Sequence, residues 1–353
     1  MSSLREGRSG WDACSTQDAQ LVERLSDQIQ ATLNPIVRGW SHCVLIDFPN
    51  HSNVGDNAIW QGEIAWLARA GIRIEYRCDV KSYSRAAVAQ ALAADGVIFI
   101  HGGGNLGDLW PRHQRLRETV IRDFPDWPVV QLPQTTHFVN RDRLAQARSV
   151  FNSHPNLTLL VRDNTSLDFA RNEFRVTSVL CPDMAFSLGP LPRPRSPEAD
   201  IFWLRREDIE AAQSATAPAD ESVIVTDWLD PRRPLLDLAR KALRPLPARF
   251  LTHYPRPRHA LSRLIDASYD WQAHLRVRFG CRLLATGRVV ITDRLHAHVL
   301  SLLLGIPHVV MDNNYGKLRR FCDTWGTLSS PLVRWARSPA DALAIARELL
   351  EKS

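Results

Sequence analysis

The sequence predicts an α/β protein with parallel sheets, divided into two domains that face each other across a cleft. Short apolar runs such as 43–46 and 96–100 alternate with segments of helical period along most of the chain. Strands that alternate with helices are typical of parallel sheets covered on both faces. Four prolines lie between residues 188 and 197, and such a cluster favours an interdomain linker.

The domain boundaries follow from the length and from this linker. A chain of 353 residues is long enough for two domains of common size. We place an N-terminal segment and helix at 1–40, an N-terminal domain at 41–188, a C-terminal domain at 199–337 and a last helix at 338–353.

Each half repeats the same alternation of strands and helices. In the first half, apolar runs predict strands over 43–46, 72–76, 96–100, 129–132, 158–161 and 177–180. Apolar residues every three or four positions predict helices over 17–38, 58–70, 84–94, 112–123, 141–152 and 165–173. In the second half we expect strands over 201–204, 223–225, 289–291 and 307–311, and helices over 233–244, 258–283, 294–304 and 339–351.

The charge balance narrows the classes of ligand. The formal net charge of +6 suits an anionic substrate or an acidic membrane surface. No zinc-finger spacing, RNA-binding signature or long basic tract is present, so we do not expect a nucleic-acid partner. The stretch 238–265 has basic residues but no acidic one, which indicates either a solvated cationic face or peripheral contact with anionic lipid.

The cysteines and the apolar runs point to a cytoplasmic protein. Six cysteines are scattered singly without CxxC spacing, as expected of reduced, mostly buried thiols. Residues 1–16 lack the apolar segment of a signal peptide, and the longest apolar run, 297–311, is broken by Gly305 and Pro307. We therefore expect a soluble chain that acts in the cytoplasm, with the inner face of the membrane as its place of contact.

Polar loops follow many of the predicted strands. In open parallel sheets, ligands bind beyond the carboxyl ends of the strands. Two such domains facing one another would bring their strand-end loops to one shared cleft. The loops in question are 50–56, 101–108, 205–208, 292–296 and 312–317.

The strand and helix around residues 289–304 carry the clearest anion-binding pattern. Thr292 or Asp293 is the expected N-cap, so Arg294 and His296 would lie in the first helical turn. The unpaired N–H groups and the positive end of the helix dipole favour an anion there. The alternative is a packed helical histidine beside a surface arginine.

Two further loops offer glycines and polar side chains. Gly55 fits a place of close backbone approach, and Asp56 is expected to cap the helix that follows. The triple glycine 102–104 follows a strand, as a ligand-binding loop would. It matches neither GxGxxG nor GxxxxGK[ST], so a dinucleotide site or a P-loop is disfavoured, and a tight turn is the alternative.

The motifs, taken in order, resemble those of the polysaccharide pyruvyl transferase family. The resemblance spans about residues 43–320. Its pieces are Asn-Val-Gly-Asp-Asn-Ala-Ile at 53–59, His-Gly-Gly-Gly-Asn at 101–105, Val-Arg-Asp-Asn-Thr-Ser at 161–166, Pro-Asp-Met-Ala-Phe at 182–186, Asp-Arg-Leu-His-Ala at 293–297, Gly-Ile-Pro at 305–307, and Lys317.

The resemblance implies a GT-B-like fold, with two Rossmann-like domains around the cleft. It also implies transfer of an enolpyruvyl-derived group from phosphoenolpyruvate to a sugar of an exopolysaccharide or another cell-surface polysaccharide, forming a pyruvate ketal. By the family pattern, Arg162, Arg294, Leu295 and His296 contact the donor. The saccharide acceptor would be a lipid-linked repeat.

The proposed chemistry explains why these residue types are needed. Arginine binds carboxylate and phosphate bidentately and stays charged, so Arg162 and Arg294 would clamp the donor from opposite domains. Carbon C2 becomes electrophilic only when C3 is protonated, and His296 is the expected general acid. The scheme requires no metal or other cofactor, and we see no cluster with metal-ligand spacing.

Other candidates have a structural alternative of equal or greater weight. Asn53 and Asp56 would bind acceptor hydroxyls or simply form a turn and a cap, and Gly103 and Asn105 would line the cleft. Lys317 would contact phosphate or be solvated. Asp183 is expected to be a turn or cap residue, and Trp60 and Trp110 would stack on a sugar or pack in the core.

Two other functions fit the same pattern. A nucleotide-sugar glycosyltransferase of the same build would bind a sugar nucleotide and ignore phosphoenolpyruvate. A non-catalytic saccharide-binding relative would keep the fold and would tolerate the loss of Arg294 or His296.

Overall fold

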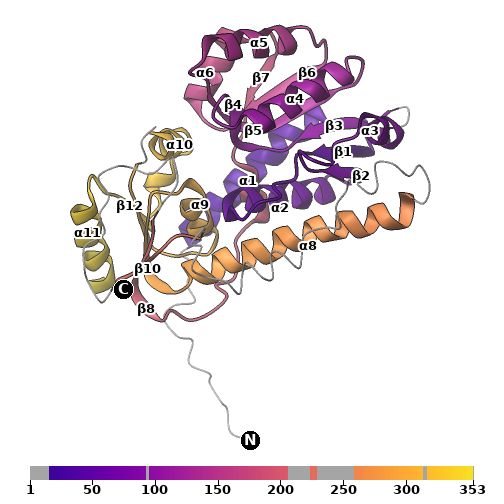
Figure 1. Cartoon of the computed structure of the whole chain (residues 1–353). Helices are drawn as coiled ribbons and strands as arrows, with labels where there is room; N and C mark the ends of the chain where they lie inside the picture. Colours follow the sequence, from indigo (N-terminus) through magenta and orange to yellow (C-terminus); the bar gives the residue numbers. More distant parts are fainter. Residues whose placement is uncertain (1–15, 93–94, 206–222, 229–257, 313–315, 353) are drawn as a thin grey trace, which may run out of the picture.

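The computed structural model describes residues 16–92, 95–205, 223–228, 258–312 and 316–352. Two parallel sheets with helices against their faces form the molecule, as the sequence predicts (Figure 1). The predicted helix at 233–244 and most of the basic stretch at 238–265 lie outside the described residues.

The first sheet has seven strands, all paired in parallel, in the order β2-β1-β3-β5-β6-β7, with β4 beside β5. The strands are β1 (His42–Ile46), β2 (Arg73–Cys78), β3 (Val97–Ile100), β4 (Gly103–Gly107), β5 (Val129–His137), β6 (Leu157–Val161) and β7 (Thr177–Leu180). The helices of this half are α1 (Thr16–Ile36), α2 (Val54–Arg69), α3 (Arg85–Leu92), α4 (Pro111–Asp123), α5 (Arg141–Asn152), α6 (Asn164–Glu173) and the 3₁₀ helix η1 (Met184–Leu188).

The second sheet has five parallel strands in the order β12-β11-β10-β8-β9. They are β8 (Ala199–Leu204), β9 (Val223–Thr226), β10 (Gly287–Thr292), β11 (His308–Val310) and β12 (Val333–Trp335). The helices are α8 (Arg258–Leu284), α9 (Leu295–Leu303), α10 (Lys317–Trp325), η3 (Thr327–Ser329) and α11 (Pro339–Glu351).

The predicted strands and helices are confirmed wherever the structure describes them, but two strands, one α-helix and the short 3₁₀ helices η1 and η3 were not predicted. Strand β4 is glycine-rich, and β12 has three residues, so neither shows an apolar run. Helix α10 begins after Gly316, which has a left-handed conformation (φ 65°) and offers no capping side chain. Its buried residues Leu318, Phe321, Cys322 and Trp325 nevertheless follow a helical period.

The predicted N-caps of α2 and α9 were wrong. Asn53 caps α2 by accepting a hydrogen bond from the backbone N–H of Gly55, so Asp56 lies in the first turn. Arg294 is the N-cap residue of α9 and makes no side-chain cap bond. The Thr292 hydroxyl instead accepts from the Arg294 backbone N–H at 3.0 Å, so it satisfies that N–H just before the helix begins.

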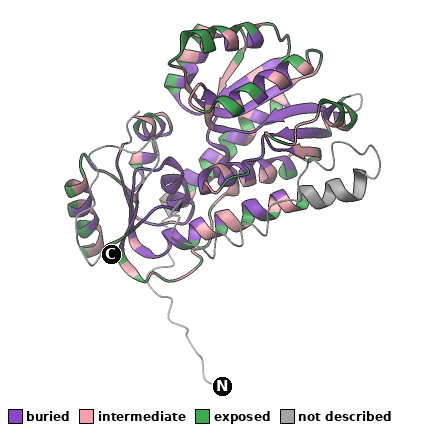
Figure 2. Ribbon diagram, viewed as in Figure 1, coloured by how far each residue is buried: buried purple, intermediate pink, exposed green. Residues whose placement is uncertain are grey.

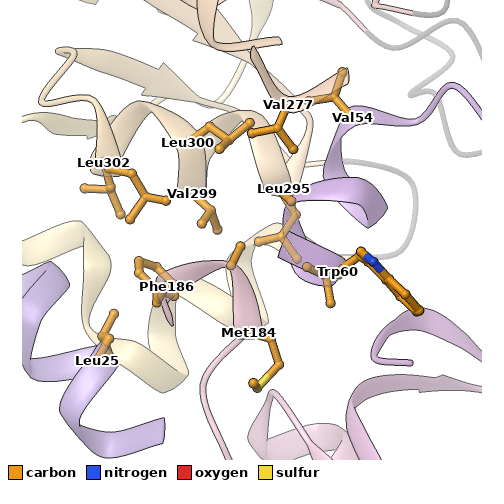
Figure 3. Close-up of a cluster of buried hydrophobic side chains, with 14 of the residues drawn as sticks. Leu25, Val54, Trp60, Met184, Phe186, Val277, Leu295, Val299, Leu300 and Leu302 are labelled. Atoms are coloured by element: carbon orange, nitrogen blue, oxygen red, sulfur yellow. The ribbon is translucent and has the colours of Figure 1, made fainter. Parts of the chain in front are cut away.

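One hydrophobic core joins the two sheets. It contains residues of both sheets, together with side chains of α1, α2, η1, α8 and α9. Figure 3 shows Leu295, Val299 and Leu300 of α9 gathered with Phe186 of η1. A second cluster lies between the first sheet and α3 to α6, and a third lies between the second sheet and α11. The inner strands are therefore buried, the edge strands are partly exposed, and the outer helices expose one face (Figure 2).

Helix α8 crosses from the second half of the chain to the first. It runs along α2, as Figure 1 shows, and contacts β2. Its Asp270 carboxylate accepts from Trp60 Nε1 and Arg77 Nη2, both at 3.3 Å. Gly280 makes this approach possible, because an added Cβ would lie against the side chain of Val54.

The five described cysteines are free and buried, as expected, and Cys14 lies outside the described residues. Among the helices in the described ranges, we find none with the length and apolar character needed to cross a bilayer.

Gly62 is expected to be essential for the packing of α2 on η1. A Cβ at this position would overlap the backbone carbonyl of Met184, which the chain does not easily move. Gly62→Ala should therefore lower the free energy of unfolding by at least about 1–3 kcal/mol, measured by urea denaturation. Ala68→Val, at an exposed position of the same helix, should cost under about 1 kcal/mol. Equal losses in the two variants would contradict this packing argument.

Candidate active site

The carboxyl ends of the two sheets border one cavity of about 380 Å³. Strand β4 and the loops after β1, β4 and β6 contribute to it from the first half. The loops after β9 and β10 and the start of α10 contribute from the second. The lining residues are His51, Ser52, Asn53, Asp56, Gly104, Asn105, Trp110, His113, Arg162, Trp228, Asp293, Arg294, Leu295, His296, Lys317 and Leu318.

Four helices begin at this cavity. The capping residues Asn53 of α2, Trp110 of α4 and Arg294 of α9 line it, and so does Lys317, the first residue of α10. Helix N-termini carry unpaired N–H groups and a partial positive charge. Their convergence, together with three cationic side chains, makes the cavity a favourable place for a small anion.

Arg162 is fully buried at the carboxyl end of β6 and is held on two sides. Its Nε donates to Thr135 Oγ1 at 2.9 Å, and its Nη1 donates to Asp183 Oδ2 at 2.5 Å. The remaining nitrogen, Nη2, is buried and has no hydrogen-bond partner among the described residues. A Cβ added to Gly104 would lie 3.1 Å from Nη2 and against Lys317 Nζ. Two cations from different halves therefore meet over a glycine, where a ligand group can approach them closely.

Asp183 links the two halves of the site. Its Oδ2 accepts from Arg162 and lies 3.3 Å from His296 Nε2, while its Oδ1 accepts from the Ala185 backbone N–H. Burial alone would raise the pKa of the Asp183 carboxyl, but His296 and Arg162 hold it well below its ordinary value. The residue does cap η1, as predicted, but its ionic partners were not predicted.

His296 reaches this cluster from the first turn of α9. Its ring lies against Gly55 in α2, where an added Cβ would overlap it. Its Nε2 is 3.4 Å from Arg162 Nη1 and 3.3 Å from the Asp183 carboxylate. Because the guanidinium offers only donors and Asp183 is ionised, Nε2 carries a hydrogen and donates it to Asp183.

In the described part of the chain, Arg294 is held by an acidic and an aromatic residue of the second half. Its Nη2 pairs with Asp227 Oδ2 at 2.5 Å, and its guanidinium carbon lies 5.5 Å from the centre of the Trp228 ring. Asp227 follows β9 and Arg294 follows β10, so the two flank the carboxyl end of β8. Both sequence-predicted arginines therefore border the same cavity, one from each half of the chain.

The remaining predicted residues are placed as follows. Leu295, Lys317, Asn53, Asp56 and Asn105 line the cavity, whereas the lining glycine is Gly104 and not Gly103. Gly103 has a φ of 122°, and an added Cβ would contact Ile59 and Asp56. Of the predicted strand-end loops, 206–208 and 313–315 lie outside the described residues.

Asn105 and Asp56 are fixed by polar neighbours. Asn105 Oδ1 accepts from Arg117 Nη2 at 2.6 Å and from Gln134 Nε2 at 2.9 Å, so the amide orientation is set. Asp56 Oδ2 accepts from Asn53 Nδ2 at 2.8 Å. Partial burial would raise the pKa of Asp56, but the histidines around it and Lys317 lower it, as expected in a positively charged pocket.

Several site residues were missed by sequence reasoning. Asp227 and Trp228 follow β9, His51 lies on the loop after β1, and His113 lies in the first turn of α4. Their positions at strand ends were the available signal. Trp60 is fully buried against Phe48, which fits its packing alternative, whereas Trp110 lines the cavity.

Fold and site together define an α/β protein with two Rossmann-like sheets and a shared cleft lined by Arg162, Arg294 and Lys317. Residues 53–315 match the polysaccharide pyruvyl transferase family, and the chain belongs to this family.

Two relatives and one solved structure extend the comparison. "Pyruvyl transferase 1" of Schizosaccharomyces pombe is 34% identical over 81% of this chain and 70% of its own length. The EpsO protein of Bacillus subtilis is 30% identical over 84% of this chain and 89% of its own length. A crystal structure of a functionally uncharacterised protein from Klebsiella pneumoniae is similar with a TM-score of 0.58 at 17% identity, covering 88% and 99% of the two chains, which supports the fold.

Gly55 is expected to be required for the position of His296. Gly55→Ala would place a methyl group where the imidazole now lies, so the ring must move. A displacement of about 1 Å at a reacting group costs about 10²-fold in rate, and we expect a loss of pyruvyl transfer of that order. Ala68→Val, at an exposed position of the same helix, should keep turnover near that of the wild type. Normal turnover of folded Gly55→Ala would contradict this placement.

Asp183→Asn should destabilise the protein in a pH-dependent way. The variant leaves buried Arg162 without its counter-charge, which costs about 3–5 kcal/mol. Because the pKa of Asp183 is lower in the folded state than its ordinary value of 3.8, the wild-type contribution is full well above pH 3.8 and declines progressively as the pH falls below it. Urea unfolding should therefore show a wide gap between wild type and variant at pH 7 and a narrower one at pH 3. Asp126→Asn, on the exposed surface, should show neither effect.

Proposed function

We propose that the protein transfers pyruvate from phosphoenolpyruvate to a sugar and leaves it as a cyclic ketal. The family assigns pyruvyl transfer, and the finer assignment rests on the cleft. The single observation that carries it is the meeting of Arg162 Nη2 and Lys317 Nζ at Gly104, beside the Asp183–His296 pair.

Phosphoenolpyruvate has two anionic groups, and the cavity has two separate cationic regions. Arg162 and Lys317 form one region, and Arg294 with the N-terminus of α9 forms the other. We assign the phosphate and the carboxylate to these two regions. A ligand held from both sides would have its C2 carbon fixed relative to His296. The donor-binding residues are thus Arg162, Arg294, Leu295 and Lys317.

His296 is assigned as the general acid. The hydrogen on Nε2, which is shared with Asp183, is the one available to the C3 methylene of the donor. Protonation of C3 makes C2 electrophilic. One sugar hydroxyl then bonds to C2, the C2–O bond to phosphate breaks, and a second hydroxyl bonds to C2. Each hydroxyl loses one proton in the sequence, one C–H bond forms, and phosphate departs.

The acceptor is assigned to the part of the cavity lined by Asn53, Asp56, Asn105 and Trp110. The first three offer hydrogen-bonding groups, and Trp110 is 42% exposed, so its face is available to a sugar ring. We propose a sugar of an exopolysaccharide or another cell-surface polysaccharide, carried as a lipid-linked repeat on the cytoplasmic side of the membrane.

Ligand binding and three variants test the assignment. Phosphoenolpyruvate should raise the melting temperature of the wild type more than sugar nucleotides do, because a ligand that binds only the folded state stabilises it. His296→Ala should keep this shift and lose about 10²–10⁴-fold in turnover, measured as phosphate release with a saccharide acceptor. Arg294→Ala should raise the donor concentration needed for half-saturation, and His274→Gln, at an exposed position of α8, should match the wild type.

Two outcomes would overturn the proposal. Stabilisation by a sugar nucleotide but not by phosphoenolpyruvate would favour a glycosyltransferase. Near-normal turnover of His296→Ala would show that His296 is not the general acid.

A further inference from the structure

We propose that His113 is the base that takes the proton from an acceptor hydroxyl, and that Asp47 is its positioning residue. The inference rests on the proposed function, because in that reaction two hydroxyl groups each lose a proton. His296 is assigned to give a proton to the donor, so another group has to accept one from a hydroxyl. None of the motifs that identify the family contains His113 or Asp47.

The two residues form a close pair at the edge of the cavity. Asp47 follows β1 and is 1% exposed, whereas His113 lies in the first turn of α4 and lines the cavity. Nδ1 of His113 lies 2.8 Å from both carboxylate oxygens of Asp47. A carboxylate only accepts, so Nδ1 carries the hydrogen. Nε2 of the neutral imidazole then holds the lone pair that a base needs.

The exposed part of the ring supports this orientation. The His113 side chain is 20% exposed, while the Asp47 side chain beneath it is 1% exposed. Among the described residues, His113 makes its side-chain hydrogen bonds through Nδ1 alone, and the residue lines the cavity. The same cavity contains Trp110, the assigned sugar platform, at the N-cap of the same helix.

The backbone at Asp47 is held in an uncommon conformation. Its φ is 78°, in the left-handed region, and it is the one non-glycine residue of the described ranges with a positive φ. The N–H groups of Asp47 and Phe48 both donate to Cys78 O, at 2.9 and 2.8 Å, which holds the turn in place. Strained backbone of this kind is found where a side chain must be aimed at a functional group. Here it aims the carboxylate at His113.

The placement of base and acid follows the proton balance. His296 gives a proton to C3 and belongs to the second half of the chain, while His113 belongs to the first. The hydroxyl O–H bond breaks as its oxygen bonds to C2, and Nε2 of His113 takes that proton. Phosphate, leaving from C2, is a suitable carrier for the other hydroxyl proton. No oxidant, reductant or further reactant is needed.

The first experiment replaces the base and supplies it again from solution. His113→Ala should keep the melting-temperature shift with phosphoenolpyruvate and lose about 10²–10⁴-fold in turnover. Imidazole added to the assay should raise the turnover of His113→Ala at least about tenfold, because imidazole can enter the space that the side chain leaves at the cavity. His113→Gln, which keeps most of the volume, should lose the same activity without rescue, and His274→Ala should resemble the wild type with and without imidazole.

The second experiment tests Asp47 as a residue that acts through His113. Asp47→Asn should lower turnover by less than His113→Ala does. The double variant should be no slower than His113→Ala, since the carboxylate has no function once the imidazole is gone. Independent, multiplying losses would indicate a purely structural contact.

The outcomes separate this inference from the proposed function. If the wild type binds and turns over phosphoenolpyruvate but His113→Ala or His113→Gln remains within threefold of it, the base assignment is wrong and the proposed function stands. If His113→Ala loses activity and imidazole restores none of it, the base assignment is also wrong. If the wild type neither binds nor turns over phosphoenolpyruvate, the proposed function is wrong, and the base assignment that rests on it is wrong as well.

Discussion

The site depends on a buried charge cluster made of Arg162, Asp183 and His296. The guanidinium and the carboxylate are each about 1% exposed, so neither has water to stabilise it. A buried ion pair is tolerated when each charge is balanced and hydrogen-bonded, and a lone member would be costly. Since His296 comes from the other half of the chain, the cluster also fixes how the two halves meet.

The surrounding structure fits this requirement. Trp325 Nε1 of α10 donates to the backbone oxygen of Arg162 at 2.8 Å, so the second half also holds the main chain at this arginine. Gly55 lets the His296 ring approach α2, and Gly104 keeps space open in front of the two cations. The glycines of the two loops therefore have a steric function at the cleft, which differs from the phosphate-wrapping loops of nucleotide-binding proteins.

The sequence predicted the fold well because hydrophobic period and strand-end polarity are local properties. It also selected Arg162, Arg294 and His296, whose residue types suit an anion and whose positions follow strands or open a helix. It missed the ion-pair partners of the two arginines, which are Asp183 for Arg162 and Asp227 for Arg294. These partners lie 21 and 67 positions away in the chain, so the pairing depends on which strands become neighbours. The cap of α9 was wrong for a related reason, because Thr292 is the last residue of β10 and its hydroxyl donates to the backbone oxygen of Leu204 on the neighbouring strand β8. His113 and Asp47 show no motif, and only the φ of Asp47 and the fold bring them together.

The course of α8 has a consequence for how this chain can be divided. The proline-rich segment at 188–197 looks like a natural place to divide the chain. Helix α8, however, follows this segment in sequence and packs on α2, which precedes it. A fragment that ended there would present Val54 and Trp60 to solvent and would leave Arg77 without the Asp270 carboxylate. The halves are therefore interdependent modules, so exchange of one half between family members would have to carry α8 together with the sheet it covers.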